Sequence, residues 1–280
     1  MNLLHKRIKN FNKIVKNFNH EKISDFVVAH KINKSLFYKL QISVKKFVKQ
    51  SKKYNFKNRT PNGKIVPKKE IIKEYTEVLI NYRNVINSLN ITDKISKWVF
   101  PVVRYKDVKI DKKFKNRPNK SELAHSDIWA GWNSNSLLIQ IPILGDTKNN
   151  RVKYYEMPKQ ITKNWLTKKT YIDAKDNFIK KCKPLNHHYN KGYIYISDII
   201  AVHKTIKKNG CKSRASIDTP LILKPYKFQS YGSNDLISNK EIFEIKKNYK
   251  LFAPLKMGEI DGIAGKKLPS TCKILKIAKS

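Results

Sequence analysis

Apolar side chains in the first third of the chain recur at helical spacing. Between residues 70 and 90 they occupy every third or fourth position, at Ile71, Ile72, Tyr75, Val78, Leu79, Tyr82, Val85 and Ile86. Such spacing places them on one face of an α-helix. Residues 35–48 show a similar pattern, with Ser35 in the position of a helix N-cap, and residues 59–63 carry turn-forming side chains. We therefore predict that residues 1–96 form a helical region that packs on the remainder of the chain.

From about residue 97 the pattern changes to short runs of strand-forming residues. These runs cover residues 97–104, 137–144, 152–156, 192–197, 202–205 and 213–223. Turn residues such as Gly145-Asp146 separate several of them, and residues 160–185 read as helical or irregular. Short strands in series are typical of a sandwich or a barrel of the jelly-roll type. The predicted fold class is thus α+β with a mainly β core over residues 97–235, followed by a tail over residues 236–280.

Composition narrows the class of protein further. With 280 residues and 40% hydrophobic side chains, the chain can bury a sizeable core. Three cysteines without a CxxC pair indicate neither a disulfide framework nor a zinc cluster. The longest apolar run, at 137–144, is far shorter than a membrane span, and the N-terminus lacks the pattern of a signal peptide. We therefore expect a cytoplasmic protein.

The net charge of +39 raises the possibility of an anionic partner. Nearly all of the 60 basic residues are lysine, as an AT-rich genome imposes through its codons, and they are spread along the whole chain. A basic surface of this kind attracts phosphosugars, anionic lipid head groups or RNA without specificity. Because the lysines form no single stripe, we do not expect a specific nucleic-acid site.

Candidate chemistry lies in His125-Ser126-Asp127 and in two later residues. On an extended segment His125 and Asp127 point to the same side. His203, brought in from a distant strand, would complete the 2-His-1-carboxylate facial triad that holds non-haem Fe(II) and leaves coordination positions open. Arg214 follows His203 by eleven positions. Its guanidinium could bind the far carboxylate of a 2-oxoglutarate (2OG) co-substrate through two parallel hydrogen bonds.

Each of these residues also has an ordinary structural interpretation. A histidine two positions before an aspartate or glutamate arises by chance at about half an occurrence in a chain of this composition. A histidine such as His203 on an apolar strand is more often a core residue than a ligand, and Arg214 could form a salt bridge with Asp218 or with a glutamate. Of the adjacent His187 and His188, at most one could be a ligand, because neighbouring side chains on an extended chain face opposite ways. Trp129 and Trp132 would serve equally as core or as a substrate wall.

Residues 121–225 resemble the phytanoyl-CoA dioxygenase-like branch of the Fe(II)/2OG-dependent oxygenases. That branch is similar in having HxD after a loop, a strand opened by glycine that leads to a distal histidine, and an arginine on the next strand. Here these are His125-Ser126-Asp127, the run 192–197 leading to His203, and Arg214. The segments 126–131 and 139–142 resemble a subgroup found in bacterial carbohydrate and aminoglycoside-type gene clusters. One departure is Tyr193, which stands where the family often has aspartate.

The resemblance implies a double-stranded β-helix over residues 97–235. It implies that His125, Asp127 and His203 bind Fe(II), with no catalytic residue beyond these ligands, and that Arg214 binds the far carboxylate of 2OG. Ser216 would donate a second hydrogen bond to that carboxylate, and Gln140 would contact the other end of the co-substrate. The implied reaction is hydroxylation of a small metabolite, either anionic or linked to a sugar.

Three other functions compete with this one. The nucleic-acid demethylases among the same oxygenases carry a second arginine six residues after the first, where this chain has Pro220. A cupin-like metal-binding or isomerase module would need the metal ligands but no anchor for 2OG. A basic protein that binds RNA or a lipid surface would need none of these residues and would show salt-dependent binding to polyanions.

Overall fold

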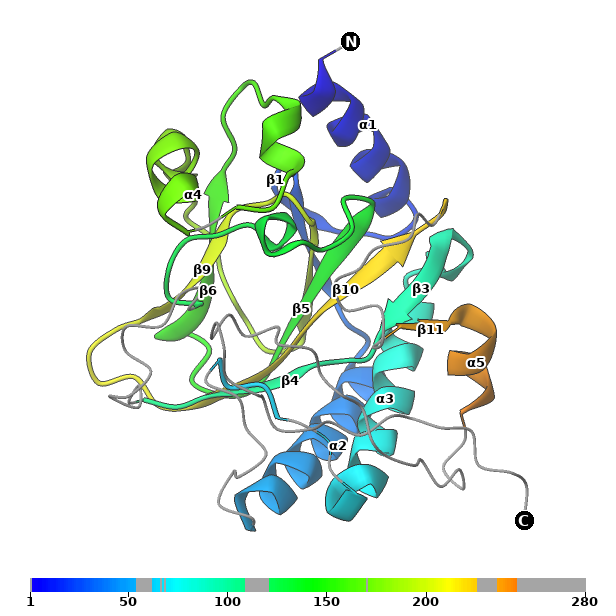
Figure 1. The fold of residues 1–280 in the computed structure, drawn as a ribbon. Coiled ribbons are helices and arrows are strands. Elements are labelled where there is room, and N and C mark those ends of the chain that lie inside the picture. Colours follow the sequence, from blue (N-terminus) through cyan, green and yellow to red (C-terminus); the bar gives the residue numbers. More distant parts are fainter. Residues whose placement is uncertain are drawn as a thin grey trace.

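The computed structural model describes residues 2–53, 62–65, 67, 69–108, 121–169, 171–225 and 236–245. Within these ranges the protein is built on two antiparallel sheets, with helices packed around them (Figure 1). The larger sheet runs in the order β1 (Glu21–Ser24), β2 (Val27–Lys31), β8 (Tyr193–Asp198), β5 (Ser136–Gly145), β10 (Arg214–Leu223), β3 (Ile95–Val99) and β11 (Leu236–Ser238), and β4 (Val103–Lys106) pairs beside β3 on β10. The smaller sheet contains β7 (Lys183–Pro184), β6 (Asn150–Glu156) and β9 (His203–Lys207).

The order in which the chain visits the two sheets defines the fold. β4, β5, β8 and β10 form the centre of the larger sheet, and a bridge at His125 pairs with His203 at the edge of the smaller one. After β4 the chain alternates between the two sheets. His125, β6 with β7, and β9 lie in the smaller sheet, and β5, β8 and β10, which follow each of them in turn, lie in the larger sheet. This alternation is a double-stranded β-helix, or jelly roll. The predicted mainly β α+β class is confirmed.

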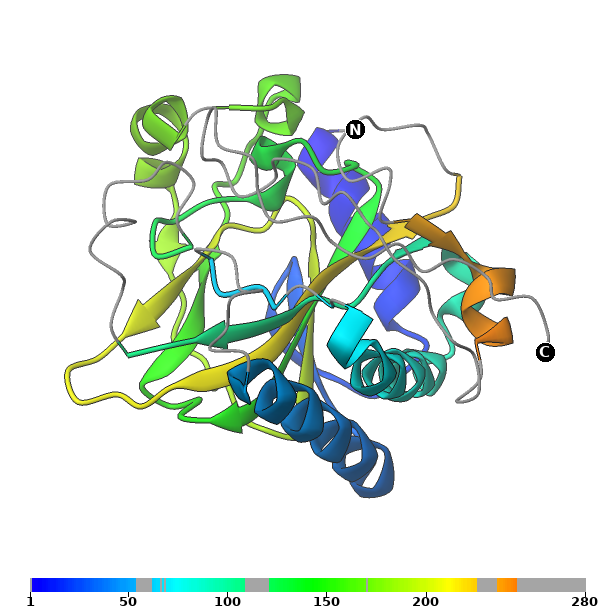
Figure 2. The same cartoon turned by 60° about the horizontal axis from the view of Figure 1, so that its bottom comes forward.

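Helices cover the outer face of the larger sheet (Figure 2). α2 (Lys34–Lys53) and α3 (Ile72–Asn87) pack against each other and contribute Phe47, Val78 and Tyr82 to a core shared with Ile139 and Ile217 of the sheet. Burial of such apolar faces supplies most of the stability of helices this short. The helix predicted over residues 70–90 is thus present as α3.

The cap of α2 differs from the prediction. The Oδ1 atom of Asn33 accepts hydrogen bonds from the backbone N–H groups of Ser35 at 2.9 Å and Leu36 at 3.4 Å. Asparagine at this position satisfies the orphan amides of the first turn as well as serine does. Asn33, and not Ser35, is therefore the N-cap of the helix.

Smaller elements complete the two ends of the chain. α1 (Leu3–Val15) precedes β1 and β2, two strands that the sequence pattern did not predict and that extend the larger sheet beside β8. β11 pairs with β3 and leads into α5 (Asn239–Glu244). Short helical turns and α4 (Tyr171–Asn177) fill residues 163–181. The turn predicted at 59–63 falls largely outside the described residues, as does most of the predicted tail. None of the described helices has the length and apolar composition that a membrane crossing requires.

Candidate metal centre

Backbone pairing brings two of the predicted ligands together. The N–H of His125 donates to the carbonyl of His203 at 2.9 Å, and the N–H of His203 donates to the carbonyl of His125 at 2.8 Å. Residues that exchange both hydrogen bonds in an antiparallel pair carry their side chains on the same face. The two imidazole rings accordingly lie with their centroids 4.6 Å apart.

Asp127 completes the group. It follows the extended residue Ser126 and opens a short helical turn over Asp127–Ala130, which directs its carboxylate toward both histidines. The Nε2 atom of His125 lies 3.7 Å from Asp127 Oδ1, and that of His203 lies 4.0 Å from Asp127 Oδ2. The three side chains offer ligand atoms that all lie within 4.8 Å of one another. Atoms separated by the two carboxylate distances can both bond one ion at about 2.1 Å.

Hydrogen bonds on the far side of each ring leave the ligand nitrogens free. His125 Nδ1 lies 2.7 Å from the carbonyl of Leu123, and His203 Nδ1 lies 3.3 Å from the carbonyl of Ala201. A carbonyl can only accept, so each Nδ1 carries the proton and each Nε2 keeps its lone pair. This is the arrangement in which metal-binding histidines are usually held.

The surroundings favour the neutral form of His125. Burial, followed by the nearby His203, lowers the pKa of His125 to about 4. At neutral pH that imidazole is uncharged and able to bind a metal. His125 is the more accessible of the two, with 29% of its side chain exposed against 6% for His203 and 18% for Asp127. The chemistry of this donor set fits a divalent transition metal.

A side-chain hydrogen bond holds the loop that carries His125 and Asp127 in place. Ser126 Oγ donates to the carbonyl of Ile199 at 3.0 Å, in the turn that leads from β8 to His203. The serine between the two predicted ligands therefore ties their loop to the segment that carries the third.

His187 has a structural role. Its Nε2 accepts the backbone N–H of Tyr154 at 3.1 Å, and its Nδ1 lies 2.7 Å from the carbonyl of His188. Both ring nitrogens are thus occupied. Among the described residues, neither His187 nor His188 belongs to a group that could hold a metal.

Arg214 lies at the start of β10 and is almost completely buried, at 2% exposure. Its Nε and Nη1 atoms have no hydrogen-bond partner in the described part of the chain. Among the described residues Arg214 forms no ion pair with Asp218 or with a glutamate, and Asp218 instead pairs with Nε of Arg104 at 2.8 Å. The guanidinium instead lies over the ring of Tyr189, with 5.3 Å from Cζ to the ring centroid.

Ser216 and Gln140 lie on neighbouring strands of the larger sheet. Ser216 is buried, follows Arg214 by two residues on β10 and lies close enough to Tyr189 to lower the pKa of that tyrosine. Gln140 is buried on β5, directly opposite Asp218, and its Oε1 accepts a hydrogen bond from the Tyr154 hydroxyl. Alternate residues of a strand share a face, so Arg214, Ser216 and Asp218 point together, while Ala215 and Ile217 join the core under the helices.

The two tryptophans next to the metal loop belong to a core cluster. Trp129 is buried, packs on Trp165 with a centroid distance of 5.3 Å and donates its Nε1–H to the carbonyl of that residue at 3.0 Å. Trp132 is partly buried against the same cluster. Of the two interpretations left open by the sequence, the core role fits Trp129.

The sequence analysis did not predict three features beside this site. They are Arg104, its pairing with Asp218, and Tyr189. Arg104 lies opposite Ser216 in the β4–β10 register. Asp218 lies near enough to the histidines that they contribute to its lowered pKa. Burial raises that pKa, but Arg104, His203, Lys106 and His125 together outweigh burial. The scarcity of arginine in a lysine-rich chain was the available signal for Arg104.

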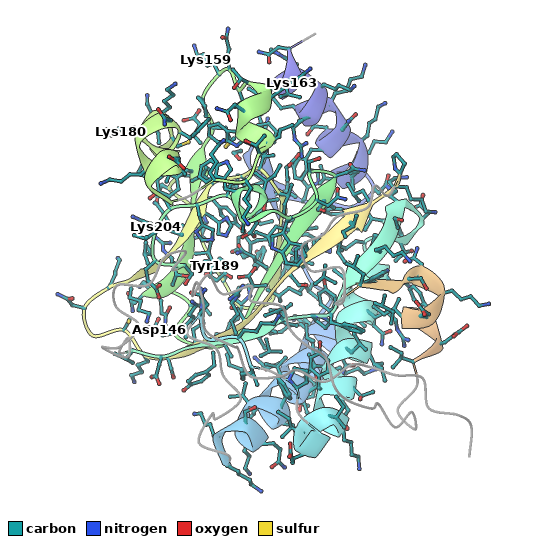
Figure 3. The ribbon with its side chains drawn as sticks, viewed as in Figure 1. Asp146, Lys159, Lys163, Lys180, Tyr189 and Lys204 are labelled. Carbon is teal, nitrogen blue, oxygen red and sulfur yellow. The ribbon has the colours of Figure 1, made fainter. Side chains whose placement is uncertain are left out.

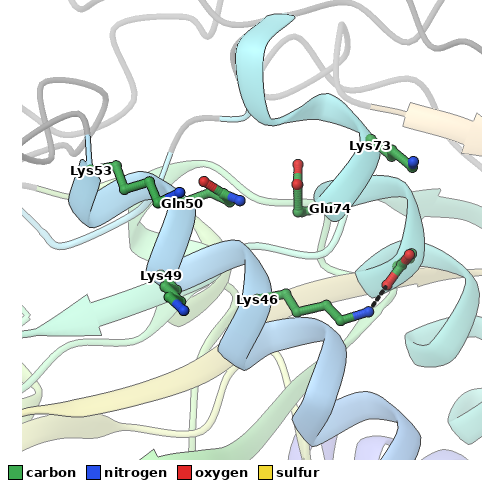
Figure 4. Close-up of a pocket in the computed structure, with 7 residues that line it drawn as sticks. Lys46, Lys49, Gln50, Lys53, Lys73 and Glu74 are labelled. Carbon is green, nitrogen blue, oxygen red and sulfur yellow. Dashed lines mark hydrogen bonds and ion pairs between the residues drawn. The ribbon is translucent and has the colours of Figure 1, made fainter.

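A separate groove lies between α2 and α3 and has a volume of about 370 Å³ (Figure 4). Its lining is Lys46, Lys49, Gln50, Lys53, Lys73, Glu74 and Glu77. Lys46 pairs with Glu77 at 3.5 Å. The groove shares no residue with the metal group, and its mixed charges indicate a solvated helix surface.

Comparison with known proteins gives a likeness of fold. No family model matches the sequence, and no curated protein matches it. The chain is similar to the solved structure of SnoN, a non-haem α-ketoglutarate-dependent epimerase from nogalamycin biosynthesis, at 7% identity and TM-score 0.45, over 97% of this chain and 96% of that one. It is also similar to EctD from S. alaskensis, solved with 2-oxoglutarate and 5-hydroxyectoine, at 11% identity and TM-score 0.45, over 78% and 75% of the two chains.

AviO1 from Streptomyces viridochromogenes Tue57 is similar at 8% identity and TM-score 0.48, over 78% of this chain and 97% of that one. Identities and TM-scores of this size assign no residue and no activity to this chain. The double-stranded β-helix rests on the strand order described above.

Proposed function

We propose that the chain is a non-haem Fe(II)/2OG-dependent oxygenase. Fe(II) would be held by His125, Asp127 and His203, and the far carboxylate of 2OG by Arg214. When bound, Fe(II) would supply the chemistry by which 2OG and dioxygen react to give succinate and CO2, with one oxygen atom of O2 going to succinate and the other to a C–H bond of the substrate, which becomes C–OH. The chain's own task is to hold and orient these partners and to keep bulk water away from them.

The observation that carries the proposal is the buried guanidinium of Arg214, whose Nε and Nη1 atoms have no hydrogen-bond partner among the described residues. A buried charge without a partner is costly, and proteins normally neutralise one with a carboxylate. Here Asp218 is already paired with Arg104, and Lys106, buried opposite Arg214 in the register, adds further positive charge. A dicarboxylate that bonds a metal at one end and meets a guanidinium at the other would offset this charge.

Ser216 and Gln140 would support the same co-substrate. We assign Ser216 to a second hydrogen bond at the far carboxylate, because it shares the face of Arg214 two residues along β10. Gln140 is assigned to the end of 2OG nearer the metal, since its partner Tyr154 lies with its ring 6.1 Å from that of His203. The reaction we propose is hydroxylation of a small metabolite. An anionic or sugar-linked substrate fits the basic charge of the chain.

Binding of the metal and 2OG can be measured without knowing the substrate. In an anaerobic titration with Fe(II) and then 2OG, a chelated pair produces a weak visible charge-transfer band, which we expect from the parent protein. We expect the band to be lost in both His203→Ala and Arg214→Ala. Binding of Fe(II) without 2OG would favour the cupin-like alternative, in which Arg214→Ala is harmless. Binding of neither would favour the basic polyanion-binding protein.

Variants of the metal ligands test the metal set itself. Asp127→Ala and His203→Ala should each lower the affinity for Fe(II) by at least about 100-fold, because each removes one of three protein ligands. Both proteins should keep the thermal unfolding midpoint that the parent shows in EDTA. An unchanged Fe(II) affinity in either variant would remove that residue from the assignment.

Arg214→Lys separates charge from geometry. Lysine keeps the positive charge but replaces a planar fork by a single ammonium group. We expect 2OG to bind about tenfold or more weakly, a loss of about 1.4 kcal/mol or more, with Fe(II) affinity unchanged. If Arg214→Lys bound 2OG as tightly as the parent, the anchor would lie elsewhere.

A further inference from the structure

Tyr189 is a buried tyrosine that the proposed roles leave unused. It precedes β8 in an irregular segment, has 2% exposure and lies in the interior, whereas Lys159 and Lys180 lie at the periphery (Figure 3). Its ring lies under the guanidinium of Arg214, with 5.3 Å between Cζ and the ring centroid. Its hydroxyl also lies close enough to Ser216 for that side chain to lower the pKa of Tyr189. One tyrosine thus lies beside both residues assigned to the far carboxylate of 2OG.

A second tyrosine packs against the ring of Tyr189. Tyr195 stacks on it at a centroid distance of 4.8 Å and an interplanar angle of 29°. The hydroxyl of Tyr195 accepts the backbone N–H of Asn190 at 2.8 Å, so the stacking itself depends on its ring. Burial raises the pKa of Tyr189 well above its ordinary value although Arg214 lowers it, so the hydroxyl stays neutral.

An aromatic face stabilises a guanidinium differently from a carboxylate. A carboxylate partner would occupy the N–H fork of Arg214, whereas a ring under the guanidinium attracts the cation through its π face and leaves donors in the plane free. This agrees with the Nε and Nη1 atoms, which have no hydrogen-bond partner among the described residues. The ring also restricts a long side chain that would otherwise lose rotamer freedom on binding a ligand.

We infer that Tyr189 is a positioning residue that holds Arg214 and Ser216 ready for the far carboxylate of a 2-oxo dicarboxylic acid. It acts through these two residues and so determines selectivity for 2OG over 2-oxo acids that lack the second carboxylate. This inference rests on the proposed function and adds a residue to it.

The test compares two co-substrates in four proteins. The anaerobic Fe(II) titration is followed with 2OG and with 2-oxopentanoate, which has a methyl group in place of the far carboxylate. The proteins are the parent, Tyr189→Phe, Tyr189→Leu and the control Tyr195→Phe. The control removes the hydroxyl of the other tyrosine in the stack, which bonds Asn190 and not Ser216.

Tyr189→Leu removes both the ring face and the hydroxyl, so its affinity for 2OG should fall roughly tenfold to hundredfold. Tyr189→Phe keeps the ring and should lose only a factor of about two to ten. Affinity for 2-oxopentanoate and for Fe(II) should stay within about twofold of the parent in all variants, as should 2OG affinity in Tyr195→Phe.

Two results would overturn the inference. One is Tyr189→Leu binding 2OG within twofold of the parent. The other is an equal loss for 2OG and 2-oxopentanoate, which would indicate a general effect on folding. Should Tyr189→Leu not fold, the test is whether Tyr189→Phe binds 2OG more weakly than Tyr195→Phe does. Equal 2OG affinities of these two variants would then overturn the inference. If the parent bound no 2OG the proposed function would fail, whereas 2OG binding that needs Arg214 and not Tyr189 would remove this inference alone.

Discussion

At the scale of single residues, the hydrogen-bond partners of each histidine separate the candidate ligands from a structural residue. His125 and His203 each donate from Nδ1 to a carbonyl, which leaves Nε2 for a ligand. His187 uses both nitrogens within the protein and has none left. The same residue type is therefore a candidate ligand in one place and a structural link in another, and the partner of each nitrogen decides between them.

His187 should make stability depend on pH. Burial lowers its pKa from 6.5 to about 4. The unfolded chain takes up this proton below about pH 6.5, while the folded protein resists it until about pH 4, so stability falls as pH drops through that window. At about 1.4 kcal/mol per pH unit, the loss near pH 4 is on the order of 2–3 kcal/mol.

The matched variant is His187→Gln, whose amide oxygen can accept the Tyr154 N–H but does not titrate. Urea unfolding from pH 7.5 to 4.5 should find the variant less stable at neutral pH, with the difference shrinking or reversing by pH 5. Other buried histidines such as His125 are present in both proteins and cancel. A difference that stays constant with pH would show that His187 does not titrate in this range.

At the scale of elements, the sequence predicted those whose pattern is local and missed those that depend on tertiary contacts. β5 and β10 carry long apolar runs with turn residues at an end, so their position follows from the pattern. β1 and β2 together cover a short, charged stretch, and their pairing depends on β8, which lies far along the chain.

The residues of the candidate site divide in the same way. His125 and Asp127 could be predicted because their spacing of two is local. His203 and Arg214 could be predicted because a family pattern gives their order along the chain. Tyr189 follows the pair His187-His188 in an irregular segment, and only the folded protein places its ring under Arg214. Packing of this kind leaves no periodic trace in a sequence.

One element-scale prediction concerns α1, which is tied to β8 by an ion pair between Arg7 and Asp198. Arg7 also donates to the carbonyl of Ser134 at 2.8 Å, and Asp198 Oδ1 accepts the N–H of Ile200 at 3.1 Å, in the turn that leads to His203. Arg7→Ala would leave the 8%-exposed Asp198 side chain without its cation. We expect a loss of roughly 2–4 kcal/mol of unfolding free energy and a weaker Fe(II) affinity.

Arg7→Lys is the control, since it restores the charge but not both hydrogen bonds, and it should recover part of each loss. Urea unfolding and Fe(II) titration measure the two effects separately. A destabilised Arg7→Ala protein with the Fe(II) affinity of the parent would show that α1 supports the fold without affecting the metal loop.

At the scale of the whole molecule, the dominant property is a net charge of +39 spread over 280 residues. Self-repulsion of that size opposes the compact state, because folding brings like charges closer together. Lys153 and Lys204 are an example of like charges brought together, because they lie opposite each other on the smaller sheet. Burial lowers the pKa of Lys153, and the charges of Arg151 and Lys204 lower it further. Salt screens such repulsion, with a Debye length of about 10 Å at 0.1 M.

We therefore expect the folded protein to become more stable as salt is added. Raising NaCl from about 20 to 300 mM shortens the Debye length from roughly 20 Å to below about 6 Å. The thermal unfolding midpoint should then rise by a few degrees, on the order of 2–4 °C for each kcal/mol gained in a chain of this size. Glycine betaine, which has no net charge, is the control for effects unrelated to screening. A midpoint that fell with NaCl would show that pairs such as Arg104–Asp218 and Arg7–Asp198 outweigh the surplus of positive charge.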